Sequence, residues 1–323
     1  MPTTCIILRG CSCLLLALVI GCTPTSDQPV ADSPSAAVPA APEPLLVGTP
    51  GRSLPLPPQR FESLRLALLP DRTAGQPWGL PYLERAVADL ARTQPDAIVG
   101  VGDMVQGYTR SVPRFRQEVA EFQNVLAGVD IPFYPTPGNH DLVAGSRQAG
   151  DDTFVSLYEE AFGPRYYAVD FGLAYIVVLS TEDLRASGGS PDFSAEQLAF
   201  LDRALATGIE RQRPIFVFMH RPAWRSRGSN FLSDVHPRLV AAGVQAVIAG
   251  HFHSLQRDPD RDGVEYHILG VCGGMIDQHP LTGQLHHVSY LTVHLDGRFE
   301  LYHSPVGHTL PDDWILSEDQ NRA

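Results

Sequence analysis

Hydrophobic and polar positions along the chain follow two alternating patterns after about residue 60. Short continuous apolar runs, such as "LALLP" (66–70) and "AIVGVG" (97–102), are typical of strands buried on both faces. Between and after them, "LPYLERAVADLART" (80–93) and "FRQEVAEFQNVLAG" (115–128) place apolar residues at helical spacing. This β-α-β rhythm predicts parallel strands joined by helices, and "IPFYP" (131–135) predicts the next strand.

The second half repeats the rhythm and then changes. "YYAVDFGLAYIVVLS" (166–180) indicates a hairpin, and "SAEQLAFLDRALA" (194–206) indicates a helix with Ser194 and Gln197 spaced as a capping box. The further elements expected are the strands 214–220 and 244–253, a helix around 237–242, and closing strands at 264–271, 288–296 and 298–304. Because the closing strands lack intervening helices, the pattern predicts an α/β fold with two sheets.

The first 22 residues have the pattern of an export signal. A short segment carrying Arg9 precedes an apolar stretch, 13–20, that is too short to span a bilayer as a permanent helix. "VIGC" (19–22) resembles a bacterial lipobox, which implies that residues 1–21 are removed and that Cys22 is lipidated; an ordinary signal peptide is the alternative. The sequence therefore predicts an exported lipoprotein, anchored to the membrane through Cys22 on the periplasmic or cell-surface side.

Composition sets the predicted domain boundaries. Residues 22–60 are dominated by Pro, Ala and Ser, and such a segment buries too little surface to fold, so we predict a flexible tether there. The folded domain is expected over residues 61–310, with a tail at 311–323. Cys272 is the one cysteine after the signal, so no disulfide is possible within the domain, and its apolar surroundings in sequence predict a buried thiol.

The balance of acidic and basic residues limits the kinds of partner that the chain is expected to bind. The chain carries 24 Lys and Arg against 36 Asp and Glu, a net charge of −12. Binding to nucleic-acid phosphates needs clustered basic residues, so the sequence shows no evident nucleic-acid-binding surface. The acidic balance suits a protein that gathers divalent cations, although net charge bears first on solubility. The oligomeric state is not predictable from the sequence.

Polar residues with metal-binding side chains follow the apolar runs at five places. They are Asp71, Asp103, Asn139 with His140 and Asp141, His220, and His251 with His253. Each one alone is better explained as a turn residue, a helix cap or a satisfied core histidine. Together they place Asp, Asn and His, which suit Mn, Fe or Zn, at the carboxyl ends of several strands, where open α/β sheets collect ligands.

These segments resemble the motifs of the calcineurin-like metallophosphoesterases, whose pattern is D-x-H, GD, GNH with an acidic residue, H, and GHxH. Here they read "PDRT", "VGDM", "PGNHD", "FMHRP" and "AGHFH", in the family's order, between residues 66 and 253. The resemblance implies a four-layer α/β/β/α sandwich, with two mixed sheets flanked by helices.

The resemblance also implies a dinuclear centre of two divalent ions (Mn²⁺, Fe²⁺/Fe³⁺ or Zn²⁺), about 3.5–4 Å apart and bridged by Asp103. Asn139, His220 and His251 would complete one site, while Asp71 and His253 would bind the other ion. A metal-bound hydroxide would attack phosphorus, His140 would protonate the leaving group, and Asp141 would orient His140.

Thr73 departs from the pattern, because the family's first motif has a histidine at this position. Three interpretations follow: a threonine hydroxyl or a water fills the vacancy and the first site is weak, the domain holds one tight ion, or catalysis has been lost. The presence of the other six ligand positions favours the first.

The implied function is metal-dependent hydrolysis of a phosphomonoester or phosphodiester in an extracytoplasmic substrate, such as a phosphorylated small molecule. Arg72, Tyr108, Arg221 and residues 224–230 are candidate phosphate contacts, with solvated surface as the simpler explanation. The alternative function is a non-catalytic, lipid-anchored binding protein with one metal or none.

Overall fold

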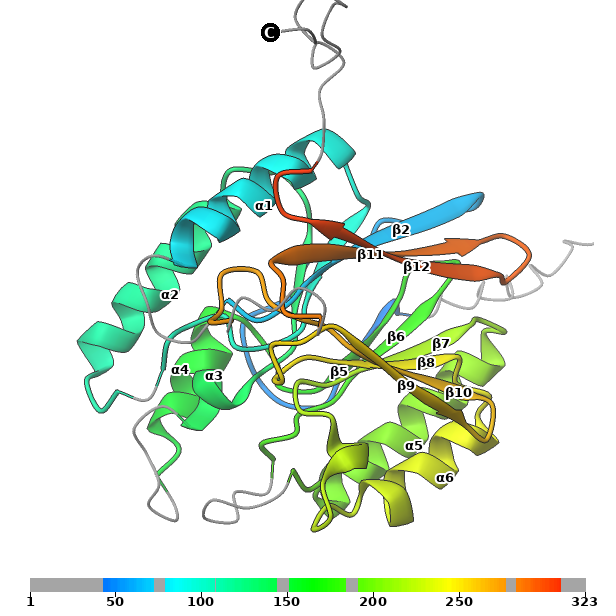
Figure 1. The fold of residues 1–323 in the computed structure, drawn as a ribbon. Helices are drawn as coiled ribbons and strands as arrows, with labels where there is room; N and C mark the ends of the chain where they lie inside the picture. Colours follow the sequence, from blue (N-terminus) through cyan, green and yellow to red (C-terminus); the bar gives the residue numbers. More distant parts are fainter. Residues whose placement is uncertain are drawn as a thin grey trace, which may run out of the picture. The chain divides into compact units, whose positions relative to one another are not determined.

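Two β-sheets packed face to face, each covered by helices, make up the part of the chain that the computed structural model describes, which is residues 43–72, 79–107, 109–143, 151–183, 191–276 and 283–308 (Figure 1). The predicted signal, Cys22, Thr73, Tyr108 and the predicted tail lie outside these ranges. None of the helices in these ranges has both the length and the apolar character needed to cross a bilayer.

The larger sheet is mixed and has seven described strands. In spatial order they are β1 (Leu45–Val47), β5 (Tyr167–Asp170), β6 (Tyr175–Val178), β7 (Ile215–Phe218), β8 (Ala246–Ala249), β10 (Val264–Ile268) and β9 (Gln256–Arg261). Its centre, from β6 through β7 and β8 to β10, is parallel, and its edges pair antiparallel. Strands β6, β7 and β8 at this centre are fully buried, as the continuous apolar runs predict.

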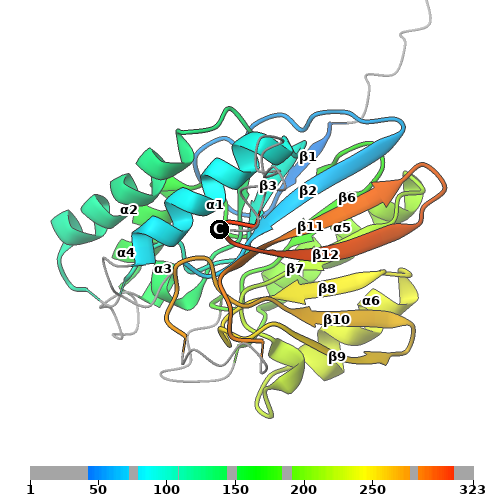
Figure 2. The same ribbon diagram turned by 45° about the horizontal axis from the view of Figure 1, so that its top comes forward.

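The smaller sheet is also mixed and has five described strands. In spatial order they are β12 (Phe299–Pro305), β11 (His287–His294), β2 (Ser63–Leu69), β3 (Ala97–Gly100) and β4 (Phe133–Pro135). Figure 2 shows β12, β11 and β2 side by side. Strands β2, β3 and β4 run parallel, so their carboxyl ends share one edge. Of the two closing strands, β11 pairs antiparallel with β2, and β12 pairs antiparallel with β11.

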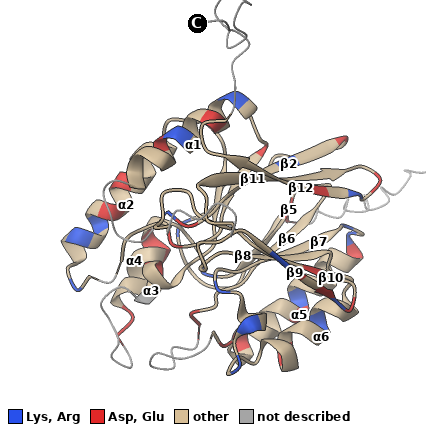
Figure 3. Cartoon of the chain, viewed as in Figure 1, with Lys and Arg blue, Asp and Glu red and all other residues tan. Residues whose placement is uncertain are grey.

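Helices cover the outer face of each sheet. On the smaller sheet lie α1 (Leu80–Thr93), α2 (Val112–Leu126) and α4 (Thr153–Ala161), with the short α3 (Asn139–Val143) beside them. On the larger sheet lie α5 (Ala195–Glu210), η2 (Ala223–Arg225), η3 (Phe231–Val235) and α6 (His236–Ala241). Acidic and basic residues both occur along α1 and α2 (Figure 3). The predicted fold class, with two mixed sheets between helical layers, is confirmed.

The predicted start of the folded domain is wrong. Residues 43–60 were assigned to the tether, but Leu45–Val47 pairs antiparallel with β5, and the side-chain hydroxyl of Thr49 accepts a hydrogen bond from the Arg165 backbone at 2.7 Å. Tyr134 also donates to the Pro55 carbonyl at 3.2 Å. The segment belongs to the compact unit that begins at Glu43. Its high proline content does not prevent this, since proline is compatible with the extended backbone of a sheet edge.

Candidate metal centre

The six predicted metal ligands gather at one edge of the fold. They follow the carboxyl ends of β2 (Asp71), β3 (Asp103), β4 (Asn139), β7 (His220) and β8 (His251 and His253). Parallel strands within each sheet bring their carboxyl ends to a common edge, and the packing of the two sheets brings the two edges together. Their assignment as ligands remains a prediction from sequence.

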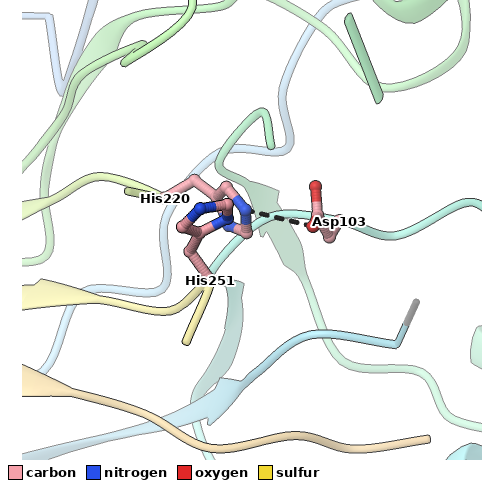
Figure 4. Close-up of side chains that lie close together, drawn as sticks. All are labelled: Asp103, His220 and His251. Atoms are coloured by element: carbon pink, nitrogen blue, oxygen red, sulfur yellow. Dashed lines mark ion pairs between the residues drawn. The ribbon is translucent and has the colours of Figure 1, made fainter. Parts of the chain in front are cut away.

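Four of the six side chains form one group around His220. The Nε2 atom of His220 lies 3.1 Å from Oδ2 of Asp103 and 3.1 Å from Oδ1 of Asn139. Potential donor atoms of Asp103, His220 and His251 all lie within 4.8 Å of one another, as Figure 4 shows for their side chains. Three such atoms at this separation can bind one ion.

Asp71 and His253 form a second, adjoining group. Nε2 of His253 lies 3.7 Å from Oδ1 of Asp71, and the same carboxylate oxygen lies 3.9 Å from Nε2 of His220. The backbone N–H of His251 donates to the Asp71 carboxylate, 3.1 Å from each oxygen. The two groups are therefore contiguous.

Two glycines of the motifs, Gly102 and Gly250, lie so close to predicted ligands that no side chain would fit there. A Cβ atom on Gly102 would lie 2.4 Å from Nδ1 of His220, and one on Gly250 would lie 2.3 Å from Oδ2 of Asp71. Three predicted ligands also have left-handed backbone, namely Asp103 (φ 56°), His251 (φ 71°) and His253 (φ 56°). Non-glycine residues adopt this conformation rarely, and strain of this kind clusters at functional sites.

Backbone carbonyls orient the imidazoles. Nδ1 of His220 lies 2.9 Å from the Val101 carbonyl, and Nδ1 of His253 lies 2.7 Å from the Met275 carbonyl. A carbonyl only accepts, so each Nδ1 carries the proton and each Nε2 is free to act as a ligand.

The electrostatics of the site fit a cation. Asp71 and Asp103 are both buried, and within the described residues neither carboxylate pairs with a Lys or Arg side chain. Burial, and to a lesser extent the charge of Asp103, raises the pKa of Asp71. Burial also opposes ionisation of Asp103, but His220 and His140 outweigh it and hold the pKa of Asp103 below its usual value.

The pKa values of His220 and His251 are shifted in opposite directions. Burial lowers the pKa of His220, but the charges of Asp103 and Asp71 reverse this and raise it to about 10. Burial and the neighbouring His220 lower the pKa of His251 to about 3, which keeps its imidazole in the neutral form that binds metals. Among the described residues, the two carboxylates are paired with imidazoles, and this set of carboxylate and imidazole donors fits divalent metal ions.

The expected role of Asp141 is wrong in detail. Its carboxylate accepts four backbone N–H groups, from Asp103 (2.9 Å), Met104 (3.0 Å), Val105 (3.2 Å) and Gly138 (2.8 Å). Nδ1 of His140 lies instead 2.5 Å from the Gln106 carbonyl, while its Nε2 lies 3.9 Å from Oδ2 of Asp103. Asp141 therefore holds the backbone of the ligand loops, and the Gln106 carbonyl orients His140.

Glu182 is a residue that sequence reasoning missed. It is buried shortly after β6 and forms an ion pair with Arg221 at 2.6 Å, directly beside His220 in sequence. The signal was present, because "IVVLSTE" (176–182) is a further apolar run that ends in a carboxylate. Of the other candidate phosphate contacts, Arg72 is buried at 4% exposure and Arg225 pairs with Asp258.

The sequence model of the calcineurin-like phosphoesterase family matches residues 64–255, which is more than half of the chain. This span contains all six predicted ligands. The chain belongs to this family. Curated relatives include the serine/threonine-protein phosphatase CPPED1 of Danio rerio (26% identical, covering 56% of this chain and 62% of the relative) and tartrate-resistant acid phosphatase type 5 of Mus musculus (26% identical, 58% and 65%). The matched region is thus less than two thirds of the length of either relative.

Solved structures share the fold. A dimetal phosphatase from Danio rerio superposes with a TM-score of 0.52 at 18% identity, covering 76% of this chain and 99% of that chain. GAP50, the anchor in the inner membrane complex of Plasmodium, gives a TM-score of 0.52 at 16% identity, covering 77% and 86%. At these identities the likeness shows the architecture and no more.

Proposed function

We propose that this protein hydrolyses phosphoester bonds with a dinuclear metal centre. The observation that carries the proposal is the continuous group of six Asp, Asn and His side chains, whose two buried carboxylates have no Lys or Arg partner in the described part of the chain. Membership of a phosphoesterase family and phosphatase relatives support it.

The geometry suggests how the ligands divide. Asp103, Asn139, His220 and His251 would hold one ion, Asp71 and His253 would contribute to the other, and Asp103 would serve both. Bound divalent ions would polarise the phosphoryl group and lower the pKa of the attacking water. His140 lies beside Asp103 on the rim of this group, where its Nε2 atom can exchange a proton with a leaving-group oxygen.

We infer from the lipobox-like "VIGC" that the enzyme is a membrane-anchored, extracytoplasmic lipoprotein, which favours phosphoesters outside the cytoplasm as substrates. In cells, Cys22→Ala is expected to move the protein from the membrane fraction to the soluble fraction. A variant that stays with the membrane would contradict the anchor.

The test of the function combines metal analysis with activity. The chelated protein is reloaded with Mn²⁺, Fe²⁺ or Zn²⁺, bound ions are counted by mass spectrometry, and p-nitrophenyl phosphate and bis-p-nitrophenyl phosphate are assayed. We expect two ions per chain and turnover of at least one ester. One ion or none, without turnover, would support the non-catalytic binding protein instead.

A matched pair of variants identifies the site. Asp103→Asn removes the charge of the carboxylate that would serve both ions and is expected to abolish turnover and lower the metal count, while the circular dichroism spectrum stays native. Asp130→Asn changes an exposed aspartate on the α2–β4 loop and should have no effect. Full activity in Asp103→Asn would exclude this centre.

A further inference from the structure

Phe252 is an exposed aromatic residue between two candidate ligands. It separates His251 from His253 in "GHFH", yet its side chain is 40% exposed. Its ring centroid lies 5.8 Å from that of His251, with the rings tilted by 40°. An isolated exposed phenylalanine is ordinary on a protein surface, but this one touches the metal-binding group.

The backbone around Phe252 is held in a strained conformation. The N–H of Phe252 donates to the Gly250 carbonyl at 2.9 Å, closing a three-residue turn whose central residue, His251, has a φ of 71°. Turns of this kind are rare, and they persist only where the surroundings impose them. The position of the Phe252 side chain is therefore tied to that of the His251 imidazole.

A polar network supports the ring from one side. The Arg225 guanidinium carbon lies over the Phe252 ring, 5.6 Å from its centroid. Arg225 is held by Asp258 on β9, with 2.6 Å between Nε and Oδ2, and Trp224 donates to the same carboxylate oxygen at 2.6 Å. A cation over an aromatic face is attractive and restrains the ring, so one face of Phe252 is occupied and the solvent-accessible remainder is fixed in place.

The surroundings of this ring suit an organic group rather than another ion. Met275, whose carbonyl orients His253, is a second exposed apolar side chain, at 51% exposure, next to the ligand group. A phosphoester held at the metal centre carries its organic group on an oxygen bonded to phosphorus, within a few ångströms of the ions. Flat aromatic groups gain most from such a surface, because offset stacking adds to the burial of area.

We infer that Phe252 forms a stacking site for an aromatic group of the substrate, so that the preferred phosphoesters carry a planar ring close to phosphorus. The inference rests on the proposed function, because it places the phosphoryl group at the candidate metal centre. It names the class of substrate, an aryl or benzyl-type ester, which the metal ligands alone leave open.

The experiment compares two ligands of matched size. Benzylphosphonate and cyclohexylmethylphosphonate differ in the flatness and π-system of the ring, and neither is hydrolysed. Their dissociation constants are measured by calorimetry with the metal-loaded full chain, and the corresponding phosphate esters are assayed for kcat/KM. We expect the wild type to prefer the benzyl ligand by about threefold to tenfold.

Variants assign the preference to one side chain. Phe252→Leu keeps an apolar side chain and should bring the two dissociation constants within about twofold of each other, whereas Phe252→Tyr should retain the preference. Phe61→Leu alters a residue that is 73% exposed just before β2 and should behave as wild type.

The outcomes separate this inference from the proposed function. Turnover without a benzyl preference, or a preference that survives in Phe252→Leu, would overturn the stacking site and leave the phosphoesterase intact. A Phe252-dependent benzyl preference without any turnover would support the stacking site and count against the hydrolytic function. Failure of both phosphonates to bind the metal-loaded protein would also overturn the stacking site.

Discussion

His140 lies next to the candidate ligands but does not belong to the group around His220. Its Nδ1 is committed to the Gln106 carbonyl, its Nε2 faces Asp103, and its side chain is 17% exposed. A general acid must reach the leaving-group oxygen while keeping one nitrogen available for the proton. A fixed Nδ1 and a partly exposed side chain beside Asp103 fit this role.

His140→Gln is therefore expected to depend on the leaving group. Alkyl phosphates, which need a proton on the departing oxygen, should slow by about 10²–10⁴-fold, while p-nitrophenyl phosphate should change much less. Metal content should be unchanged. His308→Gln, at an exposed histidine, is the control. Equal losses across a leaving-group series would remove His140 from this role.

At the scale of single residues, the sequence reveals which side chains can bind metal but not how they are oriented. His220, His253 and His140 could be chosen because they follow apolar runs and glycines. The atoms that fix their tautomers are backbone carbonyls, and carbonyls have no signature in a sequence. The expected role of Asp141 was mistaken for a similar reason, since its partners are backbone N–H groups, which have no sequence signature either.

Two loops of the smaller sheet are joined through one carboxylate. Asp141 at the start of α3 accepts N–H groups from Gly138, after β4, and from Asp103, Met104 and Val105, after β3. Burial, followed by the charge of Asp103, raises the pKa of Asp141, but all four partners are donors and favour the ionised acceptor. The Asp141 carboxylate therefore fixes the separation of the two loops that carry Asp103 and Asn139.

Asp141→Asn should therefore loosen the ligand loops. An asparagine presents an NH₂ group to at least one backbone N–H, so a donor faces a donor, and we expect the free energy of unfolding to fall by about 3 kcal/mol. The metal concentration for half-maximal activity should rise. Urea unfolding of the metal-free protein measures the first effect, with Asp130→Asn as control. Unchanged stability would show that the four hydrogen bonds are replaceable.

Elements were predictable where the pattern was strong and local. Helix α1 spans the predicted residues 80–93, because its apolar periodicity is regular. The predicted capping box of α5 is confirmed in one of its two hydrogen bonds, since the Ser194 hydroxyl accepts from the Gln197 N–H. The Gln197 side chain hydrogen-bonds to the Ser180 backbone and not to that of Ser194. Strand β1 was missed because its partner, β5, lies more than a hundred residues away.

The two sheets are held together by apolar contacts and by a buried histidine. Phe216 on β7 meets Phe299 on β12 edge to face, with centroids 5.1 Å apart. His287 on β11 accepts a hydrogen bond at Nε2 from Gly270 N–H, 2.8 Å away, just after β10 of the other sheet. Its Nδ1 lies 3.1 Å from the Ser289 hydroxyl. Because Nε2 acts as an acceptor, His287 is neutral in the folded protein.

This histidine makes the stability of the whole molecule depend on pH. Burial, and then the charge of His303, lowers the pKa of His287 to about 3, against 6.5 for an unperturbed histidine. Below pH 6.5 the unfolded chain therefore binds a proton that the folded protein excludes. The contribution of His287 to the free energy of unfolding should be constant above pH 6.5 and should decline as the pH falls towards 3, by about 2 kcal/mol between pH 7 and pH 5.

His287→Gln isolates this contribution, because glutamine keeps an acceptor for the Gly270 N–H and does not titrate. Urea unfolding of the two metal-free proteins at pH 7 and pH 5 should show the wild type losing about 2 kcal/mol more than the variant over this interval. His308→Gln, at an exposed histidine, should keep the wild-type dependence. Equal losses in wild type and His287→Gln would mean that the folded protein accommodates the proton on His287, and that the contact between β11 and the β10 segment opens at mildly acidic pH.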